Sequence, residues 1–259
     1  MINITATTNK TYKFIKSLLM KKARIEHGCF SVEGVKSVYE ALCSNADVYM
    51  LAISELMCDK CGEIISMANK RGVQIYVICD KIFGALCDTK SPEGVLCVIK
   101  TKSADIDKFD DGLYLYCDCV ADPGNAGTLI RTADAVGASG VLFSEGSVDI
   151  YNPKTVRSTM GSLFHLPVYD NVKRDVLSCM KEKGFCVLSG ALCEDAKDYQ
   201  SVKYPKKTVI VVGNEANGVS QDVLKLSDDA VIIPILGRAE SLNVSVAGSI
   251  LMYEWRRNN

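Results

Sequence analysis

The sequence predicts an α/β protein of two domains, with a mainly parallel sheet in the second. Stretches rich in β-branched residues alternate with amphipathic stretches of helical period along the chain. Such alternation produces strands joined by helices that cover both faces of a sheet. Residues 101–111 interrupt the alternation, because they are polar, charged and without periodicity. We therefore expect a linker there and domains at residues 1–104 and 105–259.

The first domain is expected to be a compact α/β unit. A Pro-Glu-Gly turn precedes its last strand, with proline and glycine at turn-favoured positions. Strands are predicted at residues 30–34, 48–53, 73–79 and 95–99, and helices at residues 10–24, 35–42, 55–71 and 82–87.

The second domain repeats the alternation with strong β-branched runs. Its last helix carries an apolar stripe of helical spacing, as a helix packed on a sheet does. Strands are predicted at residues 113–119, 141–144, 185–188, 208–212 and 231–233, and helices from residue 125 and at residues 153–160, 172–183, 216–226 and 243–255.

Composition favours a cytoplasmic protein. The N-terminus is polar and basic, unlike a signal peptide, and no apolar run approaches the ~18 residues of a membrane helix. The net charge of −1 does not by itself require a nucleic acid. Twelve cysteines are scattered through apolar stretches, as suits reduced thiols. Cys58 and Cys61 form a C-x-x-C pair, but no second pair completes a zinc site, so we expect no metal.

One local stretch is strongly basic. Residues 10–24 contain no acidic side chain, and their apolar residues suit the buried side of a helix. The basic residues are Lys10, Lys13, Lys16, Lys21, Lys22 and Arg24. Such a stripe suits contacts with nucleic-acid phosphates, and a solvated helix face is the alternative.

Residues 122–133 are the first stretch that suggests chemistry. A Pro-Gly pair suits the centre of a type II turn, and Asn125 is a natural helix N-cap. At 100° per residue, Arg131 projects away from the predicted apolar stripe of the following helix. Its guanidinium suits a phosphate or ribose, and a surface ion pair with Asp134 is the alternative.

Residues 211–218 are the second such stretch, and they directly follow a predicted strand. Gly213 and Gly218 would let a ligand approach the backbone closely. The stretch is not a P-loop, because no Lys-Ser or Lys-Thr pair follows, and it lacks the dinucleotide-binding G-x-G-x-x-G spacing. An ordinary strand-to-helix turn is the alternative.

The third stretch lies in the last thirty residues. A β-branched strand ends at Pro234, and after a loop a helix begins near Ser241 or Asn243, both good N-cap types. Polar residues at a helix start beside a strand end suit a ligand site in an open α/β sheet. Plain helix capping is the alternative.

The closing helix has a second apolar row. Val246, Ile250 and Tyr253 lie on a different face from the core-facing stripe. Ser245 and Ser249 are small and one turn apart, which would allow close approach of another surface. A partner subunit is one candidate for that surface, and we therefore expect a homodimer.

Together these three stretches resemble the SpoU (TrmH-like) family of RNA ribose 2′-O-methyltransferases, within the SPOUT superfamily. The family motif N-x-G-x-x-x-R-T-A is matched at residues 125–133 and G-x-E-x-x-G at residues 213–218. A third motif, beginning at Pro234 and ending in S-L-N-V-S-V-A, is matched to Ala247. The three occur in family order. In the first domain, F-S-V-E-G at residues 30–34 and S-P-E-G-V at residues 91–95 resemble an L30e-like RNA-binding domain.

The resemblance implies a deep trefoil knot in the second domain, a homodimer, and S-adenosylmethionine as the cofactor. Backbone groups hold the cofactor's adenosine in this family, and the matching positions are Gly213, Ile233 and Leu242. The polar site residues of the family match Asn125, Arg131, Glu215, Ser241 and Asn243.

The resemblance also implies a role for each polar residue. Arg131 is expected to activate the ribose hydroxyl or to stabilise the developing alkoxide, while Asn125, Ser241 and Asn243 orient it and the ribose. Glu215 is expected to anchor the motif loops, and a purely structural role for it is the alternative.

The RNA substrate is expected to be a guanosine of large-subunit ribosomal RNA, because small tRNA-modifying relatives often lack the first domain. A tRNA ribose methyltransferase is the alternative. A non-catalytic RNA-binding protein and a nucleotide-dependent α/β enzyme are rivals from other classes. Arg131 and Asn243 argue against the first rival, and the basic stretch argues against the second.

Overall fold

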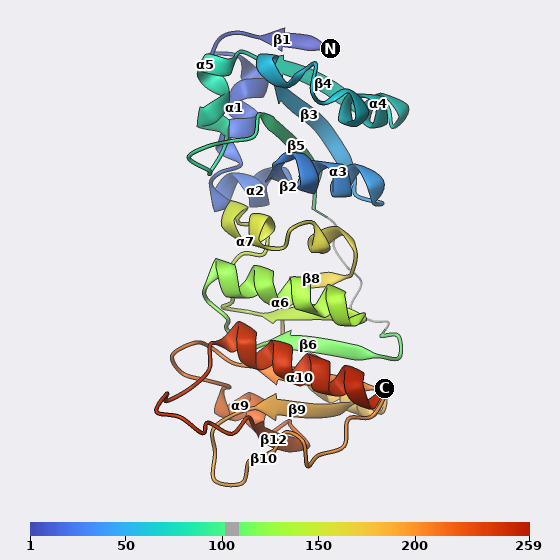
Figure 1. Cartoon of the computed structure of the whole chain (residues 1–259), viewed down its shortest axis with the longest axis vertical. Coiled ribbons are helices and arrows are strands. Elements are labelled where there is room, and N and C mark those ends of the chain that lie inside the picture. Colours follow the sequence, from blue (N-terminus) through green and yellow to red (C-terminus); the bar gives the residue numbers. More distant parts are fainter. Residues whose placement is uncertain (102–108) are drawn as a thin grey trace. The chain divides into compact units, whose positions relative to one another are not determined.

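The computed structural model describes residues 1–101 and 109–259 of the chain. The predicted boundary between residues 104 and 105, and most of the predicted linker, lie outside the described residues. The described chain forms two compact units, each with its own sheet (Figure 1). The first unit contains residues 1–101 together with residues 151–165, and the second contains the remainder.

The first unit is built on a mixed five-stranded sheet in the order β1-β4-β3-β5-β2. Strands β1, β4 and β3 are parallel, and β5 is antiparallel to both of its neighbours. The strands are β1 (Ile2–Ile4), β2 (Cys29–Glu33), β3 (Val48–Ser54), β4 (Gln74–Ile78) and β5 (Val95–Lys100). Strands β2 to β5 confirm the predicted ones, whereas β1 is too short to show a period in the sequence.

Helices cover both faces of this sheet. The helices are α1 (Lys10–Ser17), α2 (Lys21–His27), α3 (Val35–Cys43), α4 (Gly62–Lys70), α5 (Asp80–Phe83) and α7 (Pro153–Ser158), with 3₁₀ turns η1 (Glu55–Met57), η2 (Gly84–Leu86) and η3 (Ser162–Phe164). The helix predicted over residues 55–71 therefore begins only at Gly62, after the turn η1.

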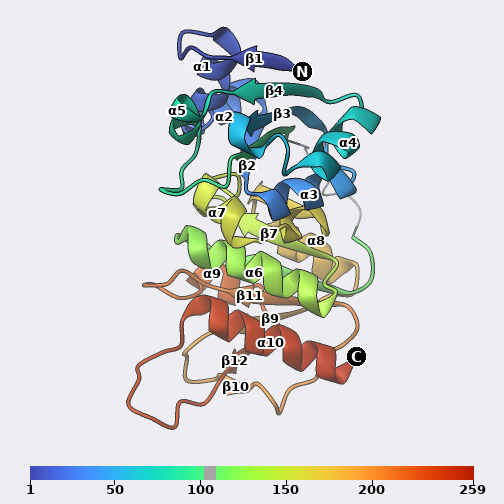
Figure 2. The ribbon, with the colours of Figure 1, turned by 45° about the horizontal axis from the view of Figure 1, so that its top comes forward.

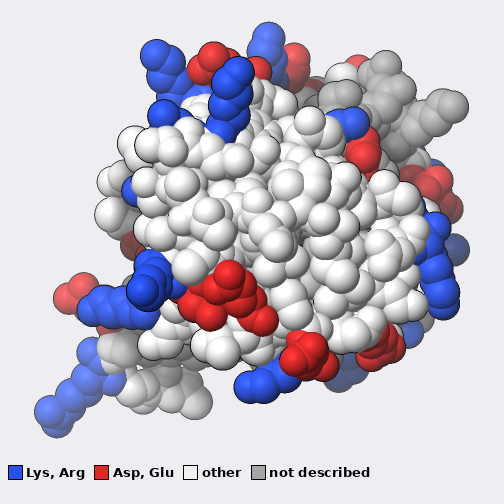
Figure 3. All heavy atoms as spheres, turned by 90° about the horizontal axis from the view of Figure 1, so that it is seen from above, with Lys and Arg blue, Asp and Glu red and all other residues white. Residues whose placement is uncertain are grey.

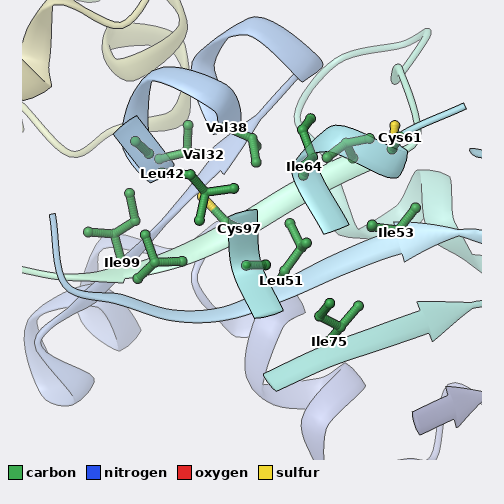
Figure 4. Close-up of a cluster of buried hydrophobic side chains, with 14 of the residues drawn as sticks. Val32, Val38, Leu42, Leu51, Ile53, Cys61, Ile64, Ile75, Cys97 and Ile99 are labelled. Carbon is green, nitrogen blue, oxygen red and sulfur yellow. The ribbon is translucent and has the colours of Figure 1, made fainter. Parts of the chain in front are cut away.

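Alternate residues of β3 belong to two separate hydrophobic cores, because successive side chains of a strand point to opposite faces of the sheet. Leu51 and Ile53 point toward Val38, Leu42 and Ile64 of α3 and α4, as Figure 4 shows. Met50 and Ala52 belong to the opposite core, which contains Tyr12, Ile15 and Leu18 of the α1 region. The sheet of the first unit is therefore buried on both faces.

The predicted basic helix over residues 10–24 is two helices. The cause lies in Arg24, which is only 4% exposed. Its Nη1 donates to the carbonyl oxygens of Leu18 at 2.8 Å and Leu19 at 2.9 Å, where α1 has ended. Carbonyls at a helix end lack an intrahelical partner, and the buried guanidinium supplies one. Arg24 thus holds the turn between α1 and α2 and does not share the surface with the lysines.

The second unit is built on a seven-stranded sheet in the order β10-β12-β9-β11-β6-β7-β8, and every pairing in it is parallel. The strands are β6 (Leu113–Cys117), β7 (Gly140–Ser144), β8 (Val168–Val172), β9 (Cys186–Gly190), β10 (Lys197–Asp198), β11 (Thr208–Val212) and β12 (Asp229–Ile232). The predicted parallel sheet is confirmed. Strands β8 and β10 are absent from the sequence prediction, and the helix predicted from residue 172 begins at Val176 because Val172 ends β8.

Two long helices of the second unit lie side by side. They are α6 (Pro123–Val136) and α10 (Val244–Asn258), and Figures 1 and 2 show them running in the same direction. A Cβ at Gly248 would lie 2.7 Å from Cδ2 of Leu129, so this glycine permits the close approach. The hydroxyls of Thr132 and Ser249 are 3.0 Å apart across the contact. The shorter helices are α8 (Val176–Glu182) and α9 (Gln221–Leu224).

The start of α6 differs from the prediction. Asp122 is the N-cap, and its Oδ1 accepts a hydrogen bond from the Asn125 amide at 2.9 Å. Pro123 and Gly124 therefore open the helix and do not form a type II turn, and Asn125 is its third residue. Asp at the N-cap with Pro at the first helical position is a favoured helix start. The side chain of Asn125 is thereby released from capping.

The start of α10 is the second of the two predicted positions. Asn243 is the N-cap, and its Oδ1 accepts from the amides of Ser245 at 2.9 Å and Val246 at 3.3 Å. The trefoil knot stays a prediction. Of the helices that the structure describes, not one has the length and apolarity needed to cross a membrane.

The structural role of Arg24 is tested by replacing it with Met. Two carbonyls would be deprived of a charged donor, and such hydrogen bonds contribute about 1.5–3 kcal/mol each. We expect Arg24→Met to lower the free energy of unfolding by about 2–3 kcal/mol in chemical denaturation. Lys22→Met, at an exposed position of the same helix, is the control and should change it little. Equal stability of the two variants would contradict the assignment.

Candidate functional site

The three motif stretches meet at one edge of the parallel sheet. Residues 118–122 follow β6, residues 213–220 follow β11, and residues 233–243 follow β12. Parallel strands place their carboxyl ends at the same edge, and this edge carries the sites of open α/β sheets. The N-termini of α6 and α10 lie at that edge as well (Figure 1).

Glu215 ties the second motif to the first. Its carboxylate accepts hydrogen bonds from the backbone amides of Ala121 and Asp122, each at 3.0 Å. It also accepts one from Nδ2 of Asn125 at 2.9 Å. Both carboxylate oxygens are therefore engaged by the segment that opens α6.

Asn125 also forms a hydrogen bond with the third motif. Its Oδ1 accepts a hydrogen bond from Nδ2 of Asn243 at 2.9 Å. Oδ1 of Asn243 in turn accepts from Oγ of Ser245 at 2.6 Å, in addition to capping α10. A chain of side-chain hydrogen bonds, Glu215–Asn125–Asn243, thus joins three segments far apart in the sequence.

The ionisation of Glu215 follows from these contacts. Partial burial by itself would raise the pKa of Glu215. The hydrogen bonds from Asn125, Ala121 and Asp122 oppose burial and together hold the pKa below its ordinary value. Glu215 is thus ionised at neutral pH.

The loop after β11 is closed tightly on itself. Asn214 and Gly218 exchange two backbone hydrogen bonds of 2.9 Å. A Cβ at Gly213 would lie 2.1 Å from the carbonyl carbon of Gly218, so only glycine fits there. Gly218 has φ +67°, a left-handed value that glycine adopts without strain. The two glycines shape the loop that presents Glu215.

Two residues that the sequence reasoning missed also hold this loop. Asp118 is 5% exposed, and its Oδ2 accepts from the Ser220 amide at 2.7 Å. Nδ2 of Asn214 donates to the carbonyl oxygen of Cys119 at 2.9 Å. The signal that could have found Asp118 is an aspartate directly after a strand, since it follows Cys117 at the end of β6.

Arg131 and Ser241 lie near the hydrogen-bonded chain without joining it. Both side chains are exposed. Within the described ranges, neither forms a hydrogen bond or an ion pair, and the alternative pair of Arg131 with Asp134 is not seen there. Arg131 lies six residues after Asn125 on α6, or about 9 Å along the helix axis at 1.5 Å per residue. Its guanidinium is available to a ligand.

The predicted RNA-binding residues belong to the first unit. Lys10, Lys13, Lys16, Lys21 and Lys22 are all exposed on α1 and α2, and Arg24 is buried. On the face of the molecule in Figure 3, charged side chains gather at the margin and the centre is mostly uncharged. Lysine and arginine side chains lie on several sides of that margin, with acidic side chains between them.

The surroundings of the C-x-x-C pair do not favour metal binding. Burial raises the pKa of both Cys58 and Cys61, which opposes the thiolate form that zinc requires. No group of three or more potential ligands that could hold a metal ion is found among residues 1–101 and 109–259.

Comparisons with known proteins identify the family of each unit. The model of the SpoU rRNA Methylase family matches residues 112–253, and that of the MRM3-like substrate binding domain matches residues 9–97. The family resemblance predicted from the motifs is confirmed.

Individual relatives differ in how much of the chain they match. The chain is 34% identical over 259 residues to the 23S rRNA (guanosine(2553)-2′-O)-methyltransferase RlmP of Bacillus subtilis, spanning 99% of this chain and 100% of the relative. It is 39% identical over 148 residues to the tRNA (guanosine(18)-2′-O)-methyltransferase of Thermus thermophilus, spanning 56% of this chain and 74% of the relative. The AdoMet-bound rRNA methyltransferase of Sinorhizobium meliloti has a TM-score of 0.89 at 30% identity, over 98% of this chain and 97% of the other.

The segment between β12 and α10 fits the cofactor of that last structure. Residues 234–242 form no hydrogen bond through their backbone groups with any other residue that the structure describes. Free N–H and C=O groups at a strand end suit recognition of a ligand such as an adenosine. The donors and acceptors present therefore fit S-adenosylmethionine.

The anchoring role of Glu215 predicts a pH dependence of stability. Its folded pKa is lowered, so its hydrogen bonds stabilise the fold above the unfolded pKa of about 4.3 and this contribution disappears as pH falls toward the folded pKa. The stability difference between the wild type and Glu215→Gln should be full above about pH 5 and shrink below about pH 4. Chemical denaturation of both proteins at several pH values from below about pH 4 to above about pH 5 measures this difference.

Glu145→Gln, at another exposed glutamate of the second unit, is the matched control and should show no such change. A Glu215→Gln difference that stays constant across the pH range would argue against an ionised anchor.

Proposed function

Because the chain belongs to the SpoU rRNA methylase family, we propose that it methylates the ribose 2′-hydroxyl of a guanosine in 23S ribosomal RNA. The chain is an S-adenosylmethionine-dependent RNA ribose 2′-O-methyltransferase.

One observation carries the choice of ribosomal RNA. The similarity to the Bacillus 23S rRNA methyltransferase runs over both units, including the residues matched by the substrate-binding model. The similarity to the Thermus tRNA methyltransferase covers only 56% of the chain. A substrate domain shared with the rRNA enzyme supports ribosomal RNA, and the guanosine follows that relative's name.

The cofactor, when bound, supplies an activated methyl group on a sulfonium. We assign its adenosine to the backbone groups of Gly213, Ile233 and Leu242. Ile233 precedes the segment 234–242, whose backbone has no partner among the described residues, and Leu242 is its last residue. Gly213 directly follows β11 at the same edge of the sheet. Gly213 itself is buried, and its backbone is packed closely against Gly218.

The protein must then place the ribose hydroxyl and ease the departure of its proton. We assign this task to Arg131, which is exposed on α6. A guanidinium keeps its charge at neutral pH, so it acts by stabilising the developing alkoxide with charge and hydrogen bonds. Ser241 is exposed in the loop before α10 and is assigned to the ribose as well.

The hydrogen bonds that connect Glu215, Asn125 and Asn243 hold the helix of Arg131 and the loop before α10 in fixed positions relative to each other. Asn125 lies on the same helix as Arg131, and Asn243 caps the helix that follows the cofactor loop. Glu215 accepts three hydrogen bonds and has a lowered pKa, so it is a poor acceptor of the ribose proton. We assign Glu215 to positioning.

A homodimer is part of the proposal. Val246 and Tyr253 of α10 are 46% and 54% exposed, and Ile250 is half-buried on the same side. These apolar side chains are the second row that the sequence predicts, and they suit contact with a second copy of the chain.

The substrate assignment is tested by mapping 2′-O-methylation across cellular RNA in strains with and without the gene. One guanosine of 23S rRNA should lose its methyl group and regain it with the wild type. Disappearance of a tRNA methylation instead, with 23S rRNA unchanged, would refute the assignment.

Arg131→Ala should slow methyl transfer by about 10²–10⁴-fold, the usual effect of removing a group that assists proton transfer. S-adenosylmethionine affinity should change little, since Arg131 is on α6 and the assigned cofactor contacts are on the segments that follow β11 and β12. Arg131→Lys should also be slow, because an ammonium does not reproduce a planar fork. Single-turnover methylation at saturating RNA, with calorimetry for the cofactor, measures both effects.

Arg256→Ala, at an exposed arginine of α10, is the control for Arg131. Near-normal turnover in Arg131→Ala would remove Arg131 from the mechanism.

The lysines of α1 should set the salt dependence of RNA binding. Replacing Lys10, Lys13 and Lys16 with Gln should reduce the log–log salt slope by about 0.7–0.9 for each phosphate that is no longer neutralised. Cofactor affinity should not change. The equivalent replacement of Lys60, Lys70 and Lys81, exposed elsewhere in the first unit, is the control. An unchanged slope in the first variant would make these lysines an ordinary solvated face.

Ile250→Glu should dissociate the dimer, because a charge would be buried at an apolar contact. Light scattering at micromolar concentration should give the mass of two chains for the wild type and of one for the variant. Lys183→Glu, exposed on the second unit, should remain dimeric. A wild type with the mass of one chain would contradict the proposal.

A further inference from the structure

Three aromatic rings lie in a row on the first unit, each from a different element. Phe14 of α1 is in the middle. Its ring centroid is 5.1 Å from that of His27, the last residue of α2, and 6.2 Å from that of Tyr49 on β3. Both contacts are edge-on, at 77° and 87°. Phe14 therefore braces Tyr49 from the side.

Tyr49 is turned outward by an irregularity of β3. Every other residue of this central strand is buried, whereas Tyr49 is 49% exposed. The pairing register with β5 shifts between Val48 and Met50, so Tyr49 is the extra residue of a β-bulge. Bulges redirect a side chain, and they are often found at functional positions. Here the bulge lifts an aromatic ring out of a strand whose other residues form the core.

The surroundings of the ring are basic. Nζ of Lys100 lies 5.6 Å from the Tyr49 ring centroid and pairs with Asp47 at 3.2 Å. Lys10 and Lys13 are exposed on the helix that carries Phe14. Two more exposed lysines open α2, which ends at His27. Glu26 and Asp47 are the neighbouring acidic residues, and Asp47 is already engaged by Lys100.

We propose that Tyr49, braced by Phe14 and adjoined by Lys100, is a stacking platform for an unpaired base of the RNA. The inference rests on the proposed RNA substrate and adds the form that the RNA takes at the first unit. A base stacks on an aromatic face while lysines hold the adjoining phosphates. Bases inside a duplex are not available for this, so the RNA segment here is single-stranded, as in a loop or bulge.

Charge favours RNA over a protein partner on this surface. The centre of a protein interface is usually depleted of charged residues and of lysine in particular. Here five exposed lysines lie on the two helices that carry two of the three rings. That combination of separate ammonium groups and an exposed ring matches the alternating phosphates and bases of a single strand.

The test is binding of the full-length protein to a labelled ten-nucleotide oligoadenylate and to an abasic strand with the same number of phosphates. The variants are Tyr49→Leu, which keeps an apolar side chain, and Tyr49→Phe, which keeps the ring. Tyr39→Leu is the matched control, because Tyr39 is a 36% exposed tyrosine on α3 of the same unit. Thermal unfolding confirms that each variant is folded.

Tyr49→Leu should weaken binding to oligoadenylate by about 5- to 150-fold, the usual effect of removing one base–aromatic stack. Its affinity for the abasic strand and its salt slope should equal those of the wild type, since the lysines that hold the phosphates are unchanged. Tyr49→Phe and Tyr39→Leu should bind both strands as the wild type does.

The platform is overturned if Tyr49→Leu binds oligoadenylate as well as the wild type, or if its affinity falls equally for both strands. A wild type that does not prefer oligoadenylate to the abasic strand overturns it as well. None of these results alters the mapping of 2′-O-methylation, which decides the proposed substrate separately.

Discussion

The site depends on the hydrogen-bonded chain from Glu215 through Asn125 to Asn243. Its two side-chain contacts, each 2.9 Å, join residues 90 and 118 positions apart in the sequence. Parallel strands bring the three loops to one sheet edge, but a strand end alone does not fix a loop. The hydrogen bonds between Glu215, Asn125 and Asn243 fix all three loops relative to one another. A displacement of Glu215 would therefore also shift residues 234–242, which precede Asn243, and the helix that carries Arg131.

Close backbone approach is the second constraint, and glycine meets it. Gly213 lets the loop after β11 fold back onto Gly218, and Gly248 lets α10 approach Leu129 of α6. The two helices that begin at the site are thus packed directly on each other. Rigid helices of this kind hold a site more accurately than loops would. The fold of the second unit accordingly supports Asn125 and Asn243 on helix starts and leaves the backbone of residues 234–242 without partners among the described residues.

The sequence predicts a large part of this arrangement, and its errors have physical reasons. Motif spacing identifies Asn125, Glu215 and Asn243, yet no local pattern shows that they contact one another across such separations. Asn125 is of a residue type as suited to an N-cap as the aspartate three residues before it, so type alone does not reveal that its amide is needed elsewhere. In the sequence, Arg24 looks like one more member of the basic stretch. A single buried arginine that donates to two backbone carbonyls produces no periodic pattern that would set it apart from the lysines. The bulge at Tyr49 is equally invisible, since it depends on the register of the partner strand.

The most direct test of this account is a double-mutant cycle between Glu215→Gln and Asn243→Ala, measured by single-turnover methyl transfer with folded variants. The two residues do not hydrogen-bond to each other and are connected through Asn125. If the hydrogen bonds couple the loops, the double variant loses less than the sum of the single losses, with a coupling of about 0.5–3 kcal/mol. Losses that add within about 0.3 kcal/mol would show that the two ends act independently, and would contradict it.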